Sequence, residues 1–516
     1  MKKEGRTYKS LLNAKINLFF YLISLFFAFF SRKIFLDNLG AEFIGLTGTL
    51  TNILGFLNIA ELGIASIICF FLYKPLQENN QEKIKEIVSL FGFIYKRIGA
   101  IIALCGVLIS LFFPLIFKNT ILGLGIIYFA FFSFLGSSLV TYFINYRQVL
   151  LTADQKNYIV AVYFQTANLL KTVIQITLAY YYKNLFLWVA IEFIFSVIAC
   201  IILNRKIDHE YPWLKVNTKN GKTLLKVYPE IFSKTKQFFI HKMKDFFLYK
   251  SDEILVFAFV SLKMVAYYGN YLLIINKILV LVNISFDSMN AGVGNLIAEG
   301  NKQNTMKVFW ELTAIRFFIT GSVIFVLFFF MESLMQVWLG KEYILDSIIL
   351  YLLIINLFIM LSRGVVEIFI HAHGLYGDTW VAWTEVILNI SITLVAAYYL
   401  GIPGILLGKI GSVILIALLW KPYYLFKKGL EVPFVKYWKG MAPYYLSLLF
   451  SLAVFFPLKK LFIDQYSENF FMLTLYAFML YTPFAILFFI LLYKTSIGMK
   501  HVTNRIPILN KIFKQK

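Results

Sequence analysis

The sequence predicts an all-α integral membrane protein with about fourteen transmembrane helices. Of its 516 residues, 60% are hydrophobic, whereas soluble domains average roughly 45–50% even when glycine is counted. Only 15% of the residues are charged, too few to solvate the surface of a soluble protein of this size. Apolar stretches of about 20 residues, the length that crosses a hydrocarbon core, alternate with short polar segments along the chain. These observations place the chain in a lipid bilayer.

The apolar stretches give the expected spans in chain order. The first apolar stretch follows a basic segment, and no small-residue cleavage site comes after the stretch. We therefore interpret this stretch as an uncleaved span and not as a secretory signal. The stretch 231–260 carries many charges, and 265–298 is interrupted by amides and charges, whereas the other twelve are clean hydrophobic windows. The fourteen predicted spans are 16–36, 44–72, 98–117, 121–146, 157–182, 185–204, 231–260, 265–298, 308–331, 345–370, 380–400, 403–420, 441–458 and 470–493.

Basic residues outside the spans are strongly biased to one side of the membrane. With the N-terminus placed in the cytoplasm, the predicted inner segments hold 31 lysines and arginines and the outer segments hold 6. The positive-inside rule predicts this bias, so we expect both termini in the cytoplasm. Topology and attraction to anionic headgroups therefore account for the net charge of +22, and we expect no nucleic-acid partner.

The longest inner loop, 205–230, divides the first six predicted helices from the next six. Because six helices return the chain to its starting side, we expect the two halves to be parallel repeats. The sequence therefore predicts an N-lobe at 1–204, a cytoplasmic linker at 205–230 and a C-lobe at 231–425. The remaining residues, 426–516, hold two nearly apolar peripheral helices and a basic tail.

The sequence offers no catalytic or metal-binding arrangement. It contains no G-x-x-x-x-G-K-[ST] motif for ATP hydrolysis. Cys69, Cys105 and Cys200 lie singly inside apolar stretches, so we expect them to be small buried hydrophobic residues. We therefore expect a protein that is not an enzyme and has no cofactor or metal.

Ionisable residues within the predicted spans are costly at membrane depth and usually face a bundle interior or a hydrated cavity. In 231–260 they recur at spacings that keep them on one face of a helix. Basic residues outnumber acidic ones on these spans, which predicts a cavity that attracts anions such as a diphosphate. The predicted substrate-binding residues are Arg32, Lys171, Lys234, His241, Lys244, Lys277, Arg316 and Arg363. The predicted polar or coupling residues are Glu61, Asp252, Asn276, Asn283, Asp287 and Glu367.

Several of these residues also have a purely structural interpretation. Arg363 and Glu367 are four residues apart, which suits an ion pair within one helix. The asparagines of the eighth predicted span, like Glu192 and Lys409, are equally suited to hydrogen bonds between helices. The charged face of 231–260 is harder to explain in this way, because a membrane-length helix cannot point such a face at lipid.

Short motifs in the chain resemble those of one transporter family, the Wzx-type polysaccharide flippases of the multidrug/oligosaccharidyl-lipid/polysaccharide exporter superfamily. The most specific motifs are LGAEFIGL at 39–46, AELGIAS at 60–66 and LYKPL at 72–76. Further blocks that carry the resemblance are 251–278, 293–301 and 401–429. Ser251-Asp252-Glu253 departs from the family's usual Thr-Asp, and Ala266 replaces a common glycine.

The resemblance implies two six-helix lobes around a central cavity, two peripheral helices and alternating access. It also implies that cationic residues of the cavity hold an undecaprenyl-diphosphate-linked oligosaccharide, which moves to the outer leaflet of a bacterial cytoplasmic membrane for capsule or lipopolysaccharide. The expected partners are this anionic lipid-linked glycan, membrane lipids and other proteins of the polysaccharide pathway. We expect the protein to be a monomer.

Two other functions remain open. A cation-coupled multidrug exporter of the same superfamily favours carboxylates in its first lobe, whereas the first predicted span here has no acid within the membrane. A membrane glycan polymerase or glycosyltransferase usually needs a sizeable external loop, and the first external loop predicted here is only 37–43.

Overall fold

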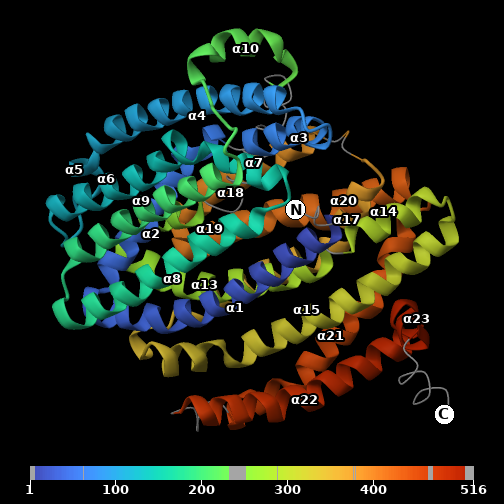
Figure 1. Ribbon diagram of the computed structural model, residues 1–516. Helices are drawn as coiled ribbons and strands as arrows, with labels where there is room; N and C mark the ends of the chain where they lie inside the picture. The colour runs from blue at the N-terminus through green and yellow to red at the C-terminus, as the bar shows by residue number, and fades with distance from the viewer. Residues whose placement is uncertain are drawn as a thin grey trace. The chain divides into compact units, whose positions relative to one another are not determined.

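In the computed structural model, the described residues form helices joined by turns and short irregular segments (Figure 1). Twelve helices of this part of the chain are long and apolar enough to cross a membrane, and two shorter apolar helices accompany them. The predicted all-α membrane class is therefore confirmed. The structure describes residues 6–61, 63–231, 251–287, 289–375, 377, 379–462 and 469–505.

The chain forms two compact units, Met1–Gly269 and Asn270–Lys516. The helices of the first unit are α1 (Arg6–Leu39), α2 (Ala41–Leu57), η1 (Asn58–Glu61), α3 (Ile64–Gln77), α4 (Gln81–Ser110), α5 (Phe113–Ile116), α6 (Leu124–Phe143), η2 (Asn145–Arg147), α7 (Gln148–Ala153), α8 (Asn157–Tyr182), α9 (Leu185–Glu210), η3 (Thr218–Asn220), α10 (Gly221–Val227), α12 (Asp252–Phe259) and the start of α13 (Leu262–Asp287). Helix α1 runs beside α8, and α9 packs against both α8 and α6 (Figure 1). The division into lobes at 204 and 231 stays a prediction.

The second unit is held together by α15, a long helix that contacts several others. The remaining helices of the chain are α14 (Asn290–Ala298), α15 (Lys302–Trp338), η4 (Lys341–Tyr343), α16 (Ser347–Ser362), α17 (Gly364–Ala372), α18 (Thr379–Leu400), α19 (Ile402–Val413), η5 (Ile414–Trp420), α20 (Lys421–Tyr424), η6 (Leu425–Gly429), α21 (Val435–Phe462), α22 (Phe470–Thr495) and α23 (Ile497–Arg505). Helix α15 packs against α16, α22 and α23. The rings of Phe325 on α15 and Phe484 on α22 stack with centroids 3.9 Å apart, which fixes the register of these two helices.

The second predicted span, 44–72, is wrong as a single helix. It is divided into α2 and α3 by the 3₁₀ turn η1. Gly63, just before α3, has a φ of 93°, a left-handed conformation that glycine adopts without steric cost. Hydropathy does not detect this break, because both halves are apolar.

Two other predicted spans also differ from the helices in the structure. The span 265–298 is divided into α13 and α14. The helix predicted at 403–420 continues through π-helical turns to Gly429, although this continuation contains Pro422. Proline lacks the N–H that an α-helix needs, and a local π-helical adjustment accommodates that loss. Most of the predicted span 231–260, namely 232–250, lies outside the described residues.

Segments predicted on the inner side meet in one hydrogen-bonded network in the first unit. The ammonium of Lys9, at the start of α1, lies 2.9 Å from a carboxylate oxygen of Asp154 in the turn between α7 and α8. In the same turn, Lys156 lies 3.1 Å from Asp154 and 3.2 Å from Glu210 at the end of α9. The predicted alternation of helix direction requires these three segments to share a side, and they do.

The predicted outer side of this unit shows the matching contact. The hydroxyl of Thr120, after α5, donates to the carboxylate of Glu42 at the start of α2 at 2.9 Å. In the second unit, the ammonium of Lys302 lies 2.5 Å from Glu431 Oε2. This ion pair joins two segments predicted on the inner side. These contacts agree with the helix order, whereas the cytoplasmic location of the termini stays a prediction.

The inner network gives the chain an acid-sensitive contact. Burial raises the pKa of Asp154, but hydrogen bonds from Lys9 and Tyr211 and the charge of Lys156 together outweigh burial, so its pKa lies below the usual 3.8. A carboxyl with a lowered pKa stabilises the fold fully above pH 3.8, and this contribution disappears as the pH falls through its lower folded value. We expect Asp154→Asn to lower the melting temperature at pH 7.

The measurement is thermal unfolding of the wild type and of Asp154→Asn in detergent between pH 7 and pH 3. The difference between their melting temperatures should shrink only below about pH 4. Glu78→Gln is the control, because Glu78 lies 3.8 Å from Lys74 in an exposed pair that should contribute little. A difference that stays constant down to pH 3 would contradict the role of the charged form.

Candidate functional site

A cavity of about 690 Å³ lies among the helices of the first unit. This volume is within the range of roughly 300–1,000 Å³ typical of small-molecule sites. Its walls come from α1, α2, α6, α9, α12 and the start of α13, and they include the aromatic rings of Phe134 and Trp188. Six residues with hydroxyl or amide groups line it: Thr47, Thr51, Asn52, Asn58, Ser137 and Ser138.

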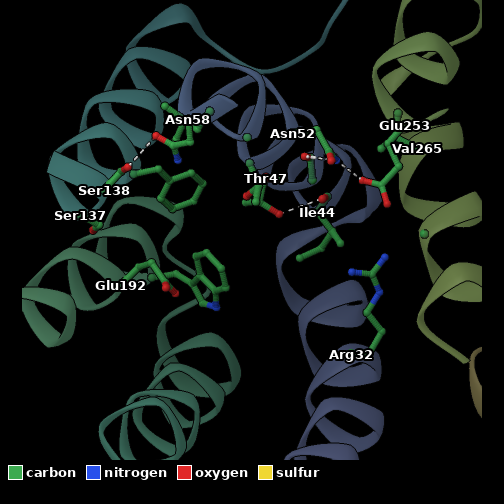
Figure 2. Close-up of a pocket in the computed structure, with 17 residues that line it drawn as sticks. Arg32, Ile44, Thr47, Asn52, Asn58, Ser137, Ser138, Glu192, Glu253 and Val265 are labelled. Carbon is green, nitrogen blue, oxygen red and sulfur yellow. Dashed lines mark hydrogen bonds between the residues drawn. The ribbon is translucent and has the colours of Figure 1, made fainter. Parts of the chain in front are cut away.

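Three charged residues of the described chain line the cavity, and two of them are acidic. Figure 2 shows Glu192 on the same side as the serines of α6, with Arg32 and Glu253 on the opposite side. The Arg32 guanidinium donates to the carbonyl oxygen of Ala266 at 3.0 Å. This cavity therefore does not have the excess of cations that the sequence predicted for the substrate site.

The predicted substrate-binding residue Lys171 pairs with a carboxylate at the cavity. Its ammonium on α8 lies 2.6 Å from Glu192 Oε1 on α9, and Gln175 donates to Glu192 Oε2 at 3.1 Å. The three side chains fasten α8 to α9. This contact matches the structural interpretation of Glu192 and gives Lys171 a charge partner.

The second carboxylate is bound by an amide across the cavity wall. Asn52 Nδ2 on α2 donates to Glu253 Oε2 on α12 at 2.5 Å and to the carbonyl oxygen of Gly48 at 2.9 Å. Both amide protons of Asn52 are thus committed. Asp252, the residue before Glu253, is buried, and the hydroxyl of Tyr268 donates to its carboxylate at 3.3 Å.

Glu61 lies next to the break between α2 and α3, beside the cavity. The phenols of Tyr95 and Tyr142 each donate to its carboxylate at 2.5 Å. Tyr142 is also within 3.1 Å of the side-chain oxygen of Asn58, which lines the cavity. A hydrogen-bonded path therefore connects the predicted coupling residue Glu61 with the cavity wall.

In the second unit, Arg316 is buried at the centre of three helices. It is 3% exposed, and it donates to Asn283 Oδ1 of α13 at 2.8 Å and to the carbonyl oxygen of Leu361 of α16 at 2.5 Å. A methyl group on Gly364 would lie 2.1 Å from the Arg316 guanidinium carbon, so only glycine leaves room for this side chain. The structure thus brings together the predicted residues Arg316 and Asn283.

Arg363 and Glu367 form the ion pair expected from their spacing, with Arg363 Nε 3.4 Å from Glu367 Oε1. The same oxygen lies 2.9 Å from the ammonium of Lys421 on α20, which the sequence did not single out. Both predicted residues therefore share one buried polar cluster with Lys421, on the side of α17 that faces α20.

The other predicted residues are placed separately or lie outside the described parts. Asn276 and Lys277 lie on α13 in the second unit, with Asn276 exposed. Asp287 ends α13, and its side chain is outside the described residues. Lys234, His241 and Lys244 fall in 232–250 and also lie outside them.

The polar face of α2 is the feature that sequence reasoning missed. Thr47 and Thr51 lie four residues apart on one face of α2, and Asn58 follows seven residues later at the start of η1. These side chains are uncharged, so a prediction based on ionisable residues does not include them. Glu253 was visible only as the extra acid after Asp252, in the departure from the family motif.

No protein-family model matches the chain, and no curated protein matches it. Solved structures are similar in fold. The lipid II flippase MurJ, in an inward closed conformation, matches over 94% of this chain and 99% of its own, with a TM-score of 0.65 and 15% identity. An inward-facing multidrug resistance transporter of the MATE family and MOP superfamily matches over 77% and 93%, with a TM-score of 0.52 and 15% identity. A MATE transporter of Vibrio cholerae matches over 82% and 99%, with a TM-score of 0.50 and 14% identity. The chain therefore has the fold of these membrane transporters.

Proposed function

We propose that this protein is a flippase that moves an undecaprenyl-diphosphate-linked oligosaccharide from the cytoplasmic to the outer leaflet of a bacterial cytoplasmic membrane. It would act by alternating access, with the polar headgroup in a hydrated cavity and the lipid tail in the bilayer. The resemblance of its motifs to Wzx-type flippases and its fold likeness to a lipid II flippase both support this substrate class.

The observation that carries the proposal is a cavity with a polar wall to which four helices of membrane length, α1, α6, α9 and α13, contribute. Hydroxyl and amide side chains in such helices favour a ligand that makes many hydrogen bonds, and an oligosaccharide headgroup is such a ligand. Both carboxylates at the cavity already accept hydrogen bonds from protein side chains, Glu192 from Lys171 and Glu253 from Asn52. These contacts reduce the attraction that they exert on a cationic ligand.

An anionic substrate is also supported by the buried bases of the second unit. Arg316, Arg363 and Lys409 are at most 9% exposed. Basic residues at membrane depth are costly and usually serve a function. With the cytoplasm negative, export of one negative charge yields about 2.3 kcal/mol per 100 mV, so a diphosphate is driven outward without ATP.

The second candidate is a multidrug exporter. It is favoured by the likeness to MATE transporters and by the presence of Glu192 and Glu253 at the cavity, since carboxylates attract cationic drugs. The two functions differ in the charge of the substrate, so one assay can separate them.

The test uses the full chain in proteoliposomes that contain undecaprenyl-diphosphate-linked disaccharide with a fluorescent label on the sugar. Dithionite added outside bleaches only the outer leaflet. We expect the protein to make the label of the inner leaflet accessible as well, at a rate that rises when the membrane potential drives negative charge outward. Empty liposomes are the control.

The same proteoliposomes loaded with ethidium test the alternative. Cation-dependent ethidium efflux without movement of the labelled lipid would replace the flippase by a multidrug exporter. Movement of the labelled lipid without ethidium efflux would support the flippase.

A further inference from the structure

The cavity of the first unit has many hydrogen-bond acceptors and few donors. The hydroxyl of Thr47 donates to the carbonyl oxygen of Ile44 at 2.8 Å, and that of Thr51 donates to the carbonyl oxygen of Thr47 at 2.7 Å. Ser137 donates in the same way to Ser133, at 3.0 Å. A hydroxyl has one proton and two lone pairs, so while these hydrogen bonds are kept each of these oxygens accepts from a ligand and does not donate to it.

The remaining polar groups of the wall extend this pattern. Ser138 commits its proton to Asn58 Oδ1 at 3.2 Å, and Asn52 commits both amide protons to Gly48 and Glu253. The side-chain oxygens of Glu192 and Glu253 accept hydrogen bonds from Lys171 and Asn52. Asn58 Nδ2, the indole N–H of Trp188 and the guanidinium of Arg32 remain as donors, and Arg32 already donates to a backbone carbonyl.

This arrangement determines which part of a lipid-linked glycan fits. Phosphate oxygens carry no proton at neutral pH, so apart from Arg32 and two neutral N–H donors they would face acceptors, two of which are carboxylates. A sugar has several hydroxyl protons that can be donated to the threonine, serine and carboxylate oxygens. Phe134 and Trp188 add aromatic surface to the wall, and aromatic rings can pack against the C–H groups of a pyranose.

We propose that this cavity is the sugar subsite of the substrate and that the diphosphate is bound by other residues. The inference rests on the proposed function and adds that the first unit selects the glycan. It assigns glycan recognition to residues other than the basic residues Arg316 and Arg363 of the second unit. Those two residues suit phosphate by charge.

The test compares two probes on the full-length protein in lipid nanodiscs: undecaprenyl diphosphate, and undecaprenyl diphosphate linked to N-acetylglucosamine. Thr47→Val with Thr51→Val removes two acceptor oxygens and keeps the side-chain shape. We expect this double variant to bind the sugar-bearing probe about tenfold more weakly and the bare diphosphate with unchanged affinity. Ser137→Ala, on another helix, should have a smaller effect of the same kind.

Thr177→Val is the matched control. Thr177 on α8 is exposed and donates to the carbonyl oxygen of Val173 at 3.0 Å, as Thr51 does to Thr47, but it does not line the cavity. It should bind both probes as the wild type does. Melting temperatures of all variants show whether they remain folded.

The outcomes separate the subsite from the proposed function. If both cavity variants weaken the two probes equally, the diphosphate lies in the cavity and the inference is overturned. If both cavity variants bind the two probes as the wild type does, the cavity does not hold the sugar, although the proposed flippase function stands. If the wild type binds neither probe, the proposed function and the inference fail together.

Discussion

Gly45→Val should slow transport by about tenfold or more while leaving the protein folded. A side chain at Gly45 on α2 would place its Cβ 1.8 Å from the carbonyl oxygen of Leu262 and 2.6 Å from its carbonyl carbon, at the start of α13. Backbone atoms cannot turn aside as a flexible side chain can, so the two helices must separate. Overpacking of this kind costs about 1–3 kcal/mol or more.

The position of this contact explains the expected loss of function. Helix α2 belongs to the predicted N-lobe and α13 to the predicted C-lobe, and the two residues flank segments predicted on the outer side. The alternating access that we propose would require a contact between the two predicted lobes to form and break in each cycle. A substitution that prevents it should slow lipid translocation by about tenfold or more, since each 1.4 kcal/mol is a factor of ten.

The measurement is the dithionite assay on Gly45→Val together with its melting temperature. Gly125→Val is the control, because a Cβ at Gly125 of α6 meets no atom within 4 Å. Normal translocation by Gly45→Val would show that the contact plays no part in the cycle. Unfolding of Gly45→Val but not of Gly125→Val would make the contact a permanent part of the fold.

Most of the helices were predictable because hydrophobic length is a local property of the sequence. The lateral contacts were not, because they depend on how helices rotate against one another. Lys171 and Glu192 are 21 residues apart on neighbouring helices, and nothing in the sequence fixes the rotation that pairs them. The break at Gly63 was missed for a related reason, since glycine is also common inside membrane helices.

The same limit applies to the prediction of the cavity's function from the sequence. The positions of charged residues in the sequence placed Arg32 at the cavity but predicted an excess of cations there, whereas its polar wall, among the described residues, consists of six hydroxyl or amide residues and only three charged ones. Uncharged polar residues such as Thr51 cost little at membrane depth, so they stand out less in a sequence. Their role becomes apparent only when the partners of each proton are known.

Glu367→Gln should be the most destabilising single change that we predict in the second unit. One oxygen of Glu367 lies 2.9 Å from the Lys421 ammonium and 3.4 Å from Arg363 Nε. The three side chains are between 10% and 29% exposed, so water screens them only partly. Removal of one charge from a buried ion pair costs about 3–5 kcal/mol, and partial exposure places this cluster near the lower end.

The measurement is thermal unfolding in detergent at pH 7, with Glu431→Gln as the matched control. Glu431 also pairs with a lysine, Lys302 at 2.5 Å, but both side chains are more than 60% exposed, so its loss should not change the melting temperature measurably. Lys421→Met added to Glu367→Gln should restore part of the lost stability, because it removes one of the two cations that the carboxylate had balanced. If Glu367→Gln proves as mild as Glu431→Gln, the buried bases of this unit do not depend on Glu367 for their charge balance, and they would be better placed to meet an anionic substrate directly.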